Sequence, residues 1–142
     1  RNRILEGICE LNRQGSTIVY TSHYMEEVEQ ICTRITIMDH GRSIASGTKE
    51  ELKRMIKTGE TISVETGMAE ERLMNRLGSL PPVFDVKYEE GMLVVRCTRS
   101  EGSLVSILKI LQEENIPFGR VYSEPPTLND VFLEITGKAL RD

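Results

Sequence analysis

The first third of the chain mixes helical and extended hydrophobic patterns. Apolar side chains recur at helical spacing from Ile4 to Leu11, which predicts a helix over 1–14 that Gly15 can end. The contiguous apolar run at 18–20 is typical of a strand that is buried on both faces of a parallel sheet. A helix with an acidic outer face is predicted to follow it, over 24–32.

A hairpin and a capped helix are predicted next. Ile35 and Ile37 alternate with polar residues, and the Asp39-His40-Gly41 sequence is typical of a tight turn between two strands. Thr48 and Glu51 have the spacing of a capping box, which predicts a helix start. This first region ends near Gly59.

The remainder of the chain has a different pattern of predicted strands and helices. The pattern predicts a strand over 61–66, a helix over 68–80, two strands over 83–97 that are joined by a turn at Glu89-Glu90-Gly91, a helix around Ile107 and a short strand over 118–123. That order is the ferredoxin-like βαββαβ pattern. A final helix is predicted to begin at the cap Thr127, to bury Leu128, Val131, Phe132 and Ile135, and to end at Gly137.

Composition excludes several classes of protein. The net charge is −4 and neither half is strongly basic, so nucleic-acid binding has no electrostatic support. The three cysteines are widely spaced, which favours a reducing cytoplasmic compartment. No apolar run approaches the roughly 20 residues of a membrane-spanning helix. Since the chain starts at Arg1 inside a helical pattern, we expect it to be part of a longer protein.

His23 is the first candidate for chemistry. It would lie at the carboxyl end of the predicted strand 18–20, and open α/β sheets bind their ligands beyond such ends. Imidazole can donate a hydrogen bond to a phosphate or orient an attacking water. The alternative is an ordinary polar residue at the end of a strand.

Other polar residues favour structural roles. Cys32, Asp39 and His40 lack the paired spacing of zinc ligands, so no metal site is predicted. Thr127 and Asp130 are interpreted as a helix cap. The final apolar stripe is interpreted as core. The acidic residues Glu26, Glu27 and Glu29 are interpreted as a solvated helix face.

A resemblance to a known family favours a functional role for His23 over a structural one. The stretch "GSTIVYTSHYMEEVEQICTRITIMDHGRSIASGTKEEL", residues 15–52, resembles the end of the ATP-binding domain of ABC transporters. In that family a strand leads to the H-loop histidine, an acidic helix follows, and a hairpin matches Gly41 and Gly47. The helix over 1–14 would then follow the family's D-loop.

The end of the chain resembles a subgroup of the same family. The segment "EPPTLNDVFLEITGKALRD" is similar to the closing segment of exporter-type ABC ATPases, which include drug-resistance subunits. These proteins carry a small accessory domain after the nucleotide-binding domain. The resemblance therefore implies a mixed α/β (α+β) chain with a partial RecA-like ATPase segment over 1–58 and a ferredoxin-like accessory domain with a C-terminal helix over 59–142.

The resemblance also implies a function for the longer protein. Such a subunit couples hydrolysis of ATP, with Mg²⁺, to export through a separate membrane permease, and it works with a second ATPase subunit at the inner face of the cell membrane. His23 would contact the γ-phosphate and position the attacking water, flanked by Ser22 and Tyr24.

The 142 residues lack the other motifs that this chemistry needs. The single Gly-Lys pair, Gly137-Lys138, is followed by Ala139, so no phosphate-loop sequence is present, and the glutamine loop, the signature motif and the magnesium-binding strand are missing too. We therefore expect the chain alone to bind no nucleotide and to be inactive. Two alternatives stay open: a regulatory or dimerisation module, for which we expect a homodimer, and a stand-alone ligand-binding domain.

Overall fold

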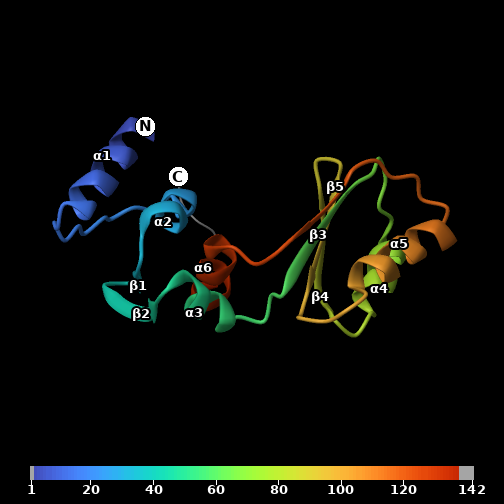
Figure 1. Ribbon diagram of the computed structural model, residues 1–142. Coiled ribbons are helices and arrows are strands. Elements are labelled where there is room, and N and C mark those ends of the chain that lie inside the picture. The colour runs from blue at the N-terminus through green and yellow to red at the C-terminus, as the bar shows by residue number, and fades with distance from the viewer. Residues whose placement is uncertain (1, 138–142) are drawn as a thin grey trace. The chain divides into compact units, whose positions relative to one another are not determined.

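The computed structural model describes residues 2–137, and these residues form two compact units (Figure 1). The first unit contains the residues up to Met55 together with those from Thr127 onward, and the second contains Ile56–Pro126. No helix in the described part of the chain is long and apolar enough to cross a membrane.

The first unit consists of helices around a short hairpin. Helix α1 spans Asn2–Arg13, α2 spans Met25–Ile31, and the antiparallel strands β1 (Ile35–Asp39) and β2 (Arg42–Gly47) follow. Helix α3 spans Lys49–Arg54, and α6 spans Leu128–Thr136. The predicted hairpin is confirmed, with His40 (φ 50°) and Gly41 (φ 73°) in the left-handed backbone region that a two-residue turn of this kind needs.

The predicted strand at residues 18–20 is wrong for this chain. Residues 16–22 form no regular element and pair with no strand among residues 2–137, and Val19 is 91% exposed. A strand needs a neighbour for its backbone hydrogen bonds. Apolar sequence alone therefore does not make a strand here.

The predicted capping box at Thr48 and the predicted helix cap at Thr127 are both confirmed. The Thr48 side chain accepts a hydrogen bond from the Glu51 N–H at the start of α3, and the Thr127 side chain accepts one from the Asp130 N–H at the start of α6. Leu128 and Val131 are buried, as predicted, while Phe132 and Ile135 are only partly buried. Helix α6 packs on α2 and α3.

The second unit has the predicted ferredoxin-like order. It runs β3 (Glu60–Glu65), α4 (Glu71–Gly78), β4 (Val83–Glu89), β5 (Met92–Cys97), α5 (Ser103–Glu113) and β6 (Val121–Glu124). The four strands form one antiparallel sheet in the order β4-β5-β3-β6, so the first and third strands of the unit are central. Helices α4 and α5 lie against the same face of this sheet (Figure 1).

Alternation along the central strands builds the core of this unit. Ile62 and Val64 of β3 and Leu93 and Val95 of β5 are fully buried, and helix residues such as Leu111 cover them. Burying a leucine or isoleucine side chain contributes about 1.5–3 kcal/mol. A bulge in β4 between Val83 and Asp85 interrupts the alternation. Phe84 therefore lies outside the row of Val86 and Tyr88, although unbroken alternation of 84, 86 and 88 would put all three on one face.

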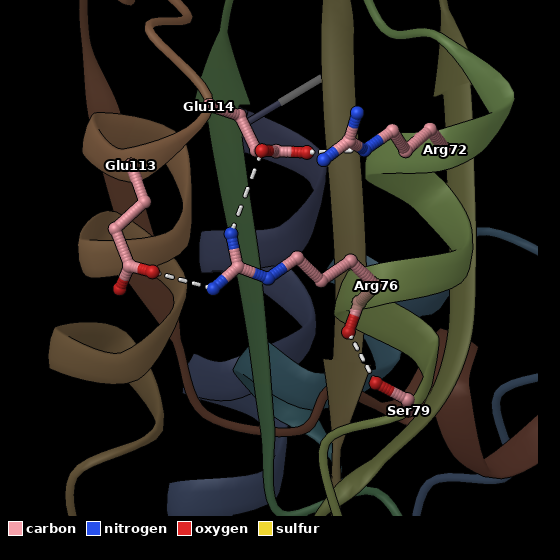
Figure 2. A network of polar contacts seen from close by, with 5 residues as sticks. All are labelled: Arg72, Arg76, Ser79, Glu113 and Glu114. Carbon is pink, nitrogen blue, oxygen red and sulfur yellow. Dashed lines mark hydrogen bonds and ion pairs between the residues drawn. The ribbon is translucent and has the colours of Figure 1, made fainter.

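Ion pairs join the two helices at their exposed sides (Figure 2). Arg76 of α4 bonds Glu113 of α5 at 2.5 Å and lies 3.6 Å from Glu114, while Arg72 lies 3.2 Å from Glu114. The hydrogen bond from Arg76 lowers the pKa of Glu113 and raises the pKa of Arg76 itself. Such exposed pairs contribute little stability and chiefly fix how the two helices face each other.

The compact units differ from the predicted domains in one respect. The predicted division falls after residue 58, close to the division at residues 55 and 56, but α6 groups with the first unit rather than with the ferredoxin-like unit. Whether 1–58 and 59–142 are the functional domains stays a prediction.

Candidate functional site

His23 lies between the irregular segment 16–22 and the start of α2. Its side chain is exposed, and its ring stacks on that of Tyr24 with 4.4 Å between centroids and 29° between planes. The Tyr24 N–H donates a hydrogen bond to Ser22 Oγ over 2.9 Å. The two flanking residues therefore hold the loop and the orientation of the imidazole.

A second contact fixes this segment against α2. The Tyr20 hydroxyl donates to Glu27 Oε1 over 3.0 Å, across the loop that carries His23. Tyr20 and Glu27 are both partly buried. Their bond ties the residues before the histidine to the first turn of the helix after it, so the loop is held at both ends.

The interpretation of the acidic residues of α2 as a solvated face is wrong for two of the three. Glu26 is exposed, as predicted, but Glu27 bonds Tyr20. Glu29 forms an ion pair with Lys53 of α3, and its carbonyl oxygen accepts a hydrogen bond from Lys49 Nζ over 3.1 Å. Sequence reasoning missed the contacts of Glu29 because Lys49 and Lys53 are at least twenty residues away. It missed the bond of Glu27 because Tyr20 lies on the other side of the loop.

A cavity of about 1150 Å³ lies beside this loop within the first unit. Apolar side chains of α1, α2 and β1 form much of its wall, including Ile8, Val28 and Ile35. His23, Ser22 and Tyr20 are at its margin. His23 therefore lies on an exposed loop at the edge of this largely apolar cavity.

The thiols and the second histidine do not make a metal site. Among residues 2–137 no group of three or more His, Cys, Asp or Glu side chains could hold a metal ion. Burial, followed by the nearby Cys9, raises the pKa of Cys32. A thiol with a raised pKa is a poorer ligand, because the thiolate binds metals. His40 lies in the hairpin turn, where its Nε2 is 3.9 Å from Asp39 Oδ1.

The arrangement around His23 suits contact with one phosphate oxygen. An exposed imidazole and a neighbouring hydroxyl can donate hydrogen bonds, yet the described residues around them offer no glycine-rich phosphate loop and no cluster of metal ligands. Stabilising a transferring phosphoryl group needs these additional parts. His23 is thus a component that could contribute to a nucleotide site, and not a nucleotide site by itself.

Comparison with known proteins identifies the relatives of the chain. Residues 47–136 match the family model described as the C-terminal domain of the DrrA1-3-like ATP-binding protein. The linearmycin resistance ATP-binding protein LnrL of Bacillus subtilis is 37% identical over the whole chain, which covers 46% of that relative. The Nod factor export ATP-binding protein I of Rhizobium etli is 31% identical over 99% of the chain and 42% of its own length.

A third relative agrees with these two. The daunorubicin resistance ATP-binding protein DrrA2 of Streptomyces coeruleorubidus is 29% identical over 96% of the chain, which covers 43% of that protein. The chain therefore spans less than half the length of these relatives. The matches include the His23 region as well as the ferredoxin-like unit, since nearly the whole chain is covered.

Proposed function

Because the chain belongs to the DrrA1-3-like ATP-binding proteins of the ABC transporter family, we propose that it is the C-terminal part of a subunit that couples ATP hydrolysis to export. The observation that carries this proposal is the match of residues 47–136 to the C-terminal domain of that family. Relatives named for antibiotic resistance and for Nod factor export support export as the process.

In the longer protein, His23 contacts the γ-phosphate of ATP and orients the attacking water. Its exposed ring, held by Tyr24 and by the bond between Tyr20 and Glu27, supports this role. A ring that is held before the nucleotide arrives loses little entropy on binding, which favours a positioned hydrogen bond. Ser22 keeps the loop in place through Tyr24.

The cofactors and partners follow from the same family. The longer protein uses ATP with Mg²⁺, acts with a second ATPase subunit and drives a separate membrane permease, at the cytoplasmic face of the membrane. His23 then links the nucleotide state to closure of the two ATPase subunits. Residues upstream supply the phosphate loop and the metal ligands, which the 142 residues lack.

A second candidate function applies to the chain taken alone. The ferredoxin-like unit has its own core and sheet, and its residues carry no nucleotide motif. A regulatory or dimerisation module fits these two observations. It is compatible with the first function if the module acts on the ATPase subunit to which it belongs.

A comparison of two proteins tests the proposed function. The longer protein should bind Mg-ATP and release inorganic phosphate, whereas the 142-residue chain should show no heat of Mg-ATP binding in calorimetry, because the groups that cradle the phosphates are outside it. Micromolar binding to the short chain would contradict the assignment of nucleotide binding to other residues. A longer protein that binds Mg-ATP without hydrolysing it would contradict the ATPase function.

A further inference from the structure

Strand β4 is an edge of the sheet in the second unit. The sheet order places β5 on one side of β4, and no strand among residues 2–137 pairs with its other side. The hairpin to β5 turns through two residues, Glu90 and Gly91, so Glu89 and Met92 form a hydrogen-bonded pair. By alternation, the backbone groups of Val86 and Tyr88 point to the free edge.

The sequence of this edge has a two-fold pattern. Around Val86 it reads aromatic, acidic, valine, basic, aromatic, which are Phe84, Asp85, Val86, Lys87 and Tyr88. We propose that the β4 edge pairs with the β4 edge of a second copy of this chain, antiparallel and symmetric about Val86. The two sheets then continue into one.

In this register the charged side chains next to Val86 form favourable pairs. Asp85 of one copy lies opposite Lys87 of the other, and the symmetry gives this pair twice. These residues form non-hydrogen-bonded pairs, which bring the side chains closest together. The two Val86 residues exchange backbone hydrogen bonds.

The neighbouring symmetric registers fit less well. Pairing about Lys87 would place Asp85 opposite Glu89 twice, and pairing about Asp85 would place the two Asp85 side chains opposite each other, which is destabilising in both cases. Pairing about Tyr88 gives Lys87 opposite Glu89, but it moves Glu90 of the turn into the paired segment and leaves Asp85 unmatched. Symmetry about Val86 pairs Asp85 with Lys87 on the part of the strand that follows the bulge.

The surface next to the edge supports a second copy as the occupant. A shallow cavity of about 520 Å³ lies between α4 and β4, with Met74 and Gly78 on the helix side and Phe84 and Val86 on the strand side. Its lining also includes the polar residues Asn75, Ser79 and Asp85. A copy placed across the two-fold axis would cover this mixed polar and apolar hollow. A lysine and a bulge on an edge strand hinder pairing with unrelated strands. The β4 edge therefore favours a partner strand that places a carboxylate opposite Lys87. The β4 edge of a second copy does so with Asp85.

This pairing does not depend on the nucleotide chemistry proposed above, so either can fail without the other. In a transporter with two such ATPase subunits, it would hold two accessory units together. The contact between the two edges is small, so it is expected to be weak by itself. Association of the two ATPase subunits would bring the two β4 edges close together and so raise their effective concentration.

Charge reversal with complementation tests the proposal on the 142-residue chain. Sedimentation equilibrium should show the average mass rising with concentration from 16.1 kDa toward the dimer. Asp85→Lys and Lys87→Asp should each weaken dimerisation about tenfold, because attraction becomes repulsion at both pairs. Lys109→Asp, on the exposed side of α5, is the matched control and should dimerise like the wild type.

The mixture of the two variants gives the decisive result. Asp85→Lys carries two lysines at the edge and Lys87→Asp two aspartates, so an equimolar mixture should form mixed dimers at concentrations where each variant alone, dimerising about tenfold more weakly than the wild type, is largely monomeric. Circular dichroism of each variant checks the fold. A mixture that stays monomeric, a wild type that is monomeric at millimolar concentration, or a dimer that Lys87→Asp leaves unchanged would each overturn the proposal.

Discussion

The variant His23→Ala of the longer protein is expected to bind Mg-ATP nearly as tightly as the wild type and to hydrolyse it about 10²–10³-fold more slowly. Binding is preserved because most of the contacts to the nucleotide come from residues outside this loop. Turnover falls because the proposed role of the imidazole, orienting the attacking water at the γ-phosphate, is realised only in the reaction. The measurement is single-turnover phosphate release together with calorimetric binding of Mg-ATP.

The other histidine provides the control for this variant. His40 lies in the hairpin turn at φ 50°, so asparagine, which tolerates that backbone conformation, is the suitable replacement. His40→Asn should leave turnover unchanged. Wild-type turnover in His23→Ala, or an equal loss in both variants, would contradict the role assigned to His23.

Replacing Leu111 by alanine is expected to lower the unfolding free energy of the ferredoxin-like unit by about 3 kcal/mol. Leu111 is fully buried and packs in the cluster that joins α5 to the central strands, so truncation leaves a cavity there. Hydrogen exchange at the amides of Ile62 and Val95, on the two central strands, reports the global unfolding of this unit.

A matched variant on the same helix separates burial from helix propensity. Val105 is 63% exposed, so Val105→Ala removes little buried surface and exchanges one helix residue for a better helix former. Its exchange rates should stay within a factor of a few of the wild type. Equal acceleration in both variants would show that the core is not where the structure places it.

The ferredoxin-like unit could be predicted from sequence because all the strands and helices that pack together lie within one continuous segment. Each of its strands finds its neighbour within Ile56–Pro126, and the alternation of Ile62 and Val64 matches the face that α4 and α5 cover. The exception is the bulge at Val83 and Asp85, which shifts Phe84 out of its expected row. Bulges depend on local strand twist and leave no reliable mark in a hydrophobic pattern.

The first unit could be predicted only in part. Its hairpin and caps rest on local residues, which is why Gly41, Thr48 and Thr127 indicated them correctly. The apolar run at 18–20 predicted a strand, but a strand also needs a partner, and the described residues provide none. His23 precedes the predicted acidic helix but does not follow a strand as expected, and the bonds of Tyr20 and Glu29 depend on tertiary packing.

The central claim is that His23 senses the γ-phosphate in the longer protein, and nuclear magnetic resonance of its imidazole nitrogens tests this most directly. With Mg²⁺ and a non-hydrolysable ATP analogue, the His23 ring signals should shift, and with Mg-ADP they should stay at their nucleotide-free positions. The His40 signals should be the same in all three states. Identical His23 signals with the ATP analogue and with ADP would contradict the claim.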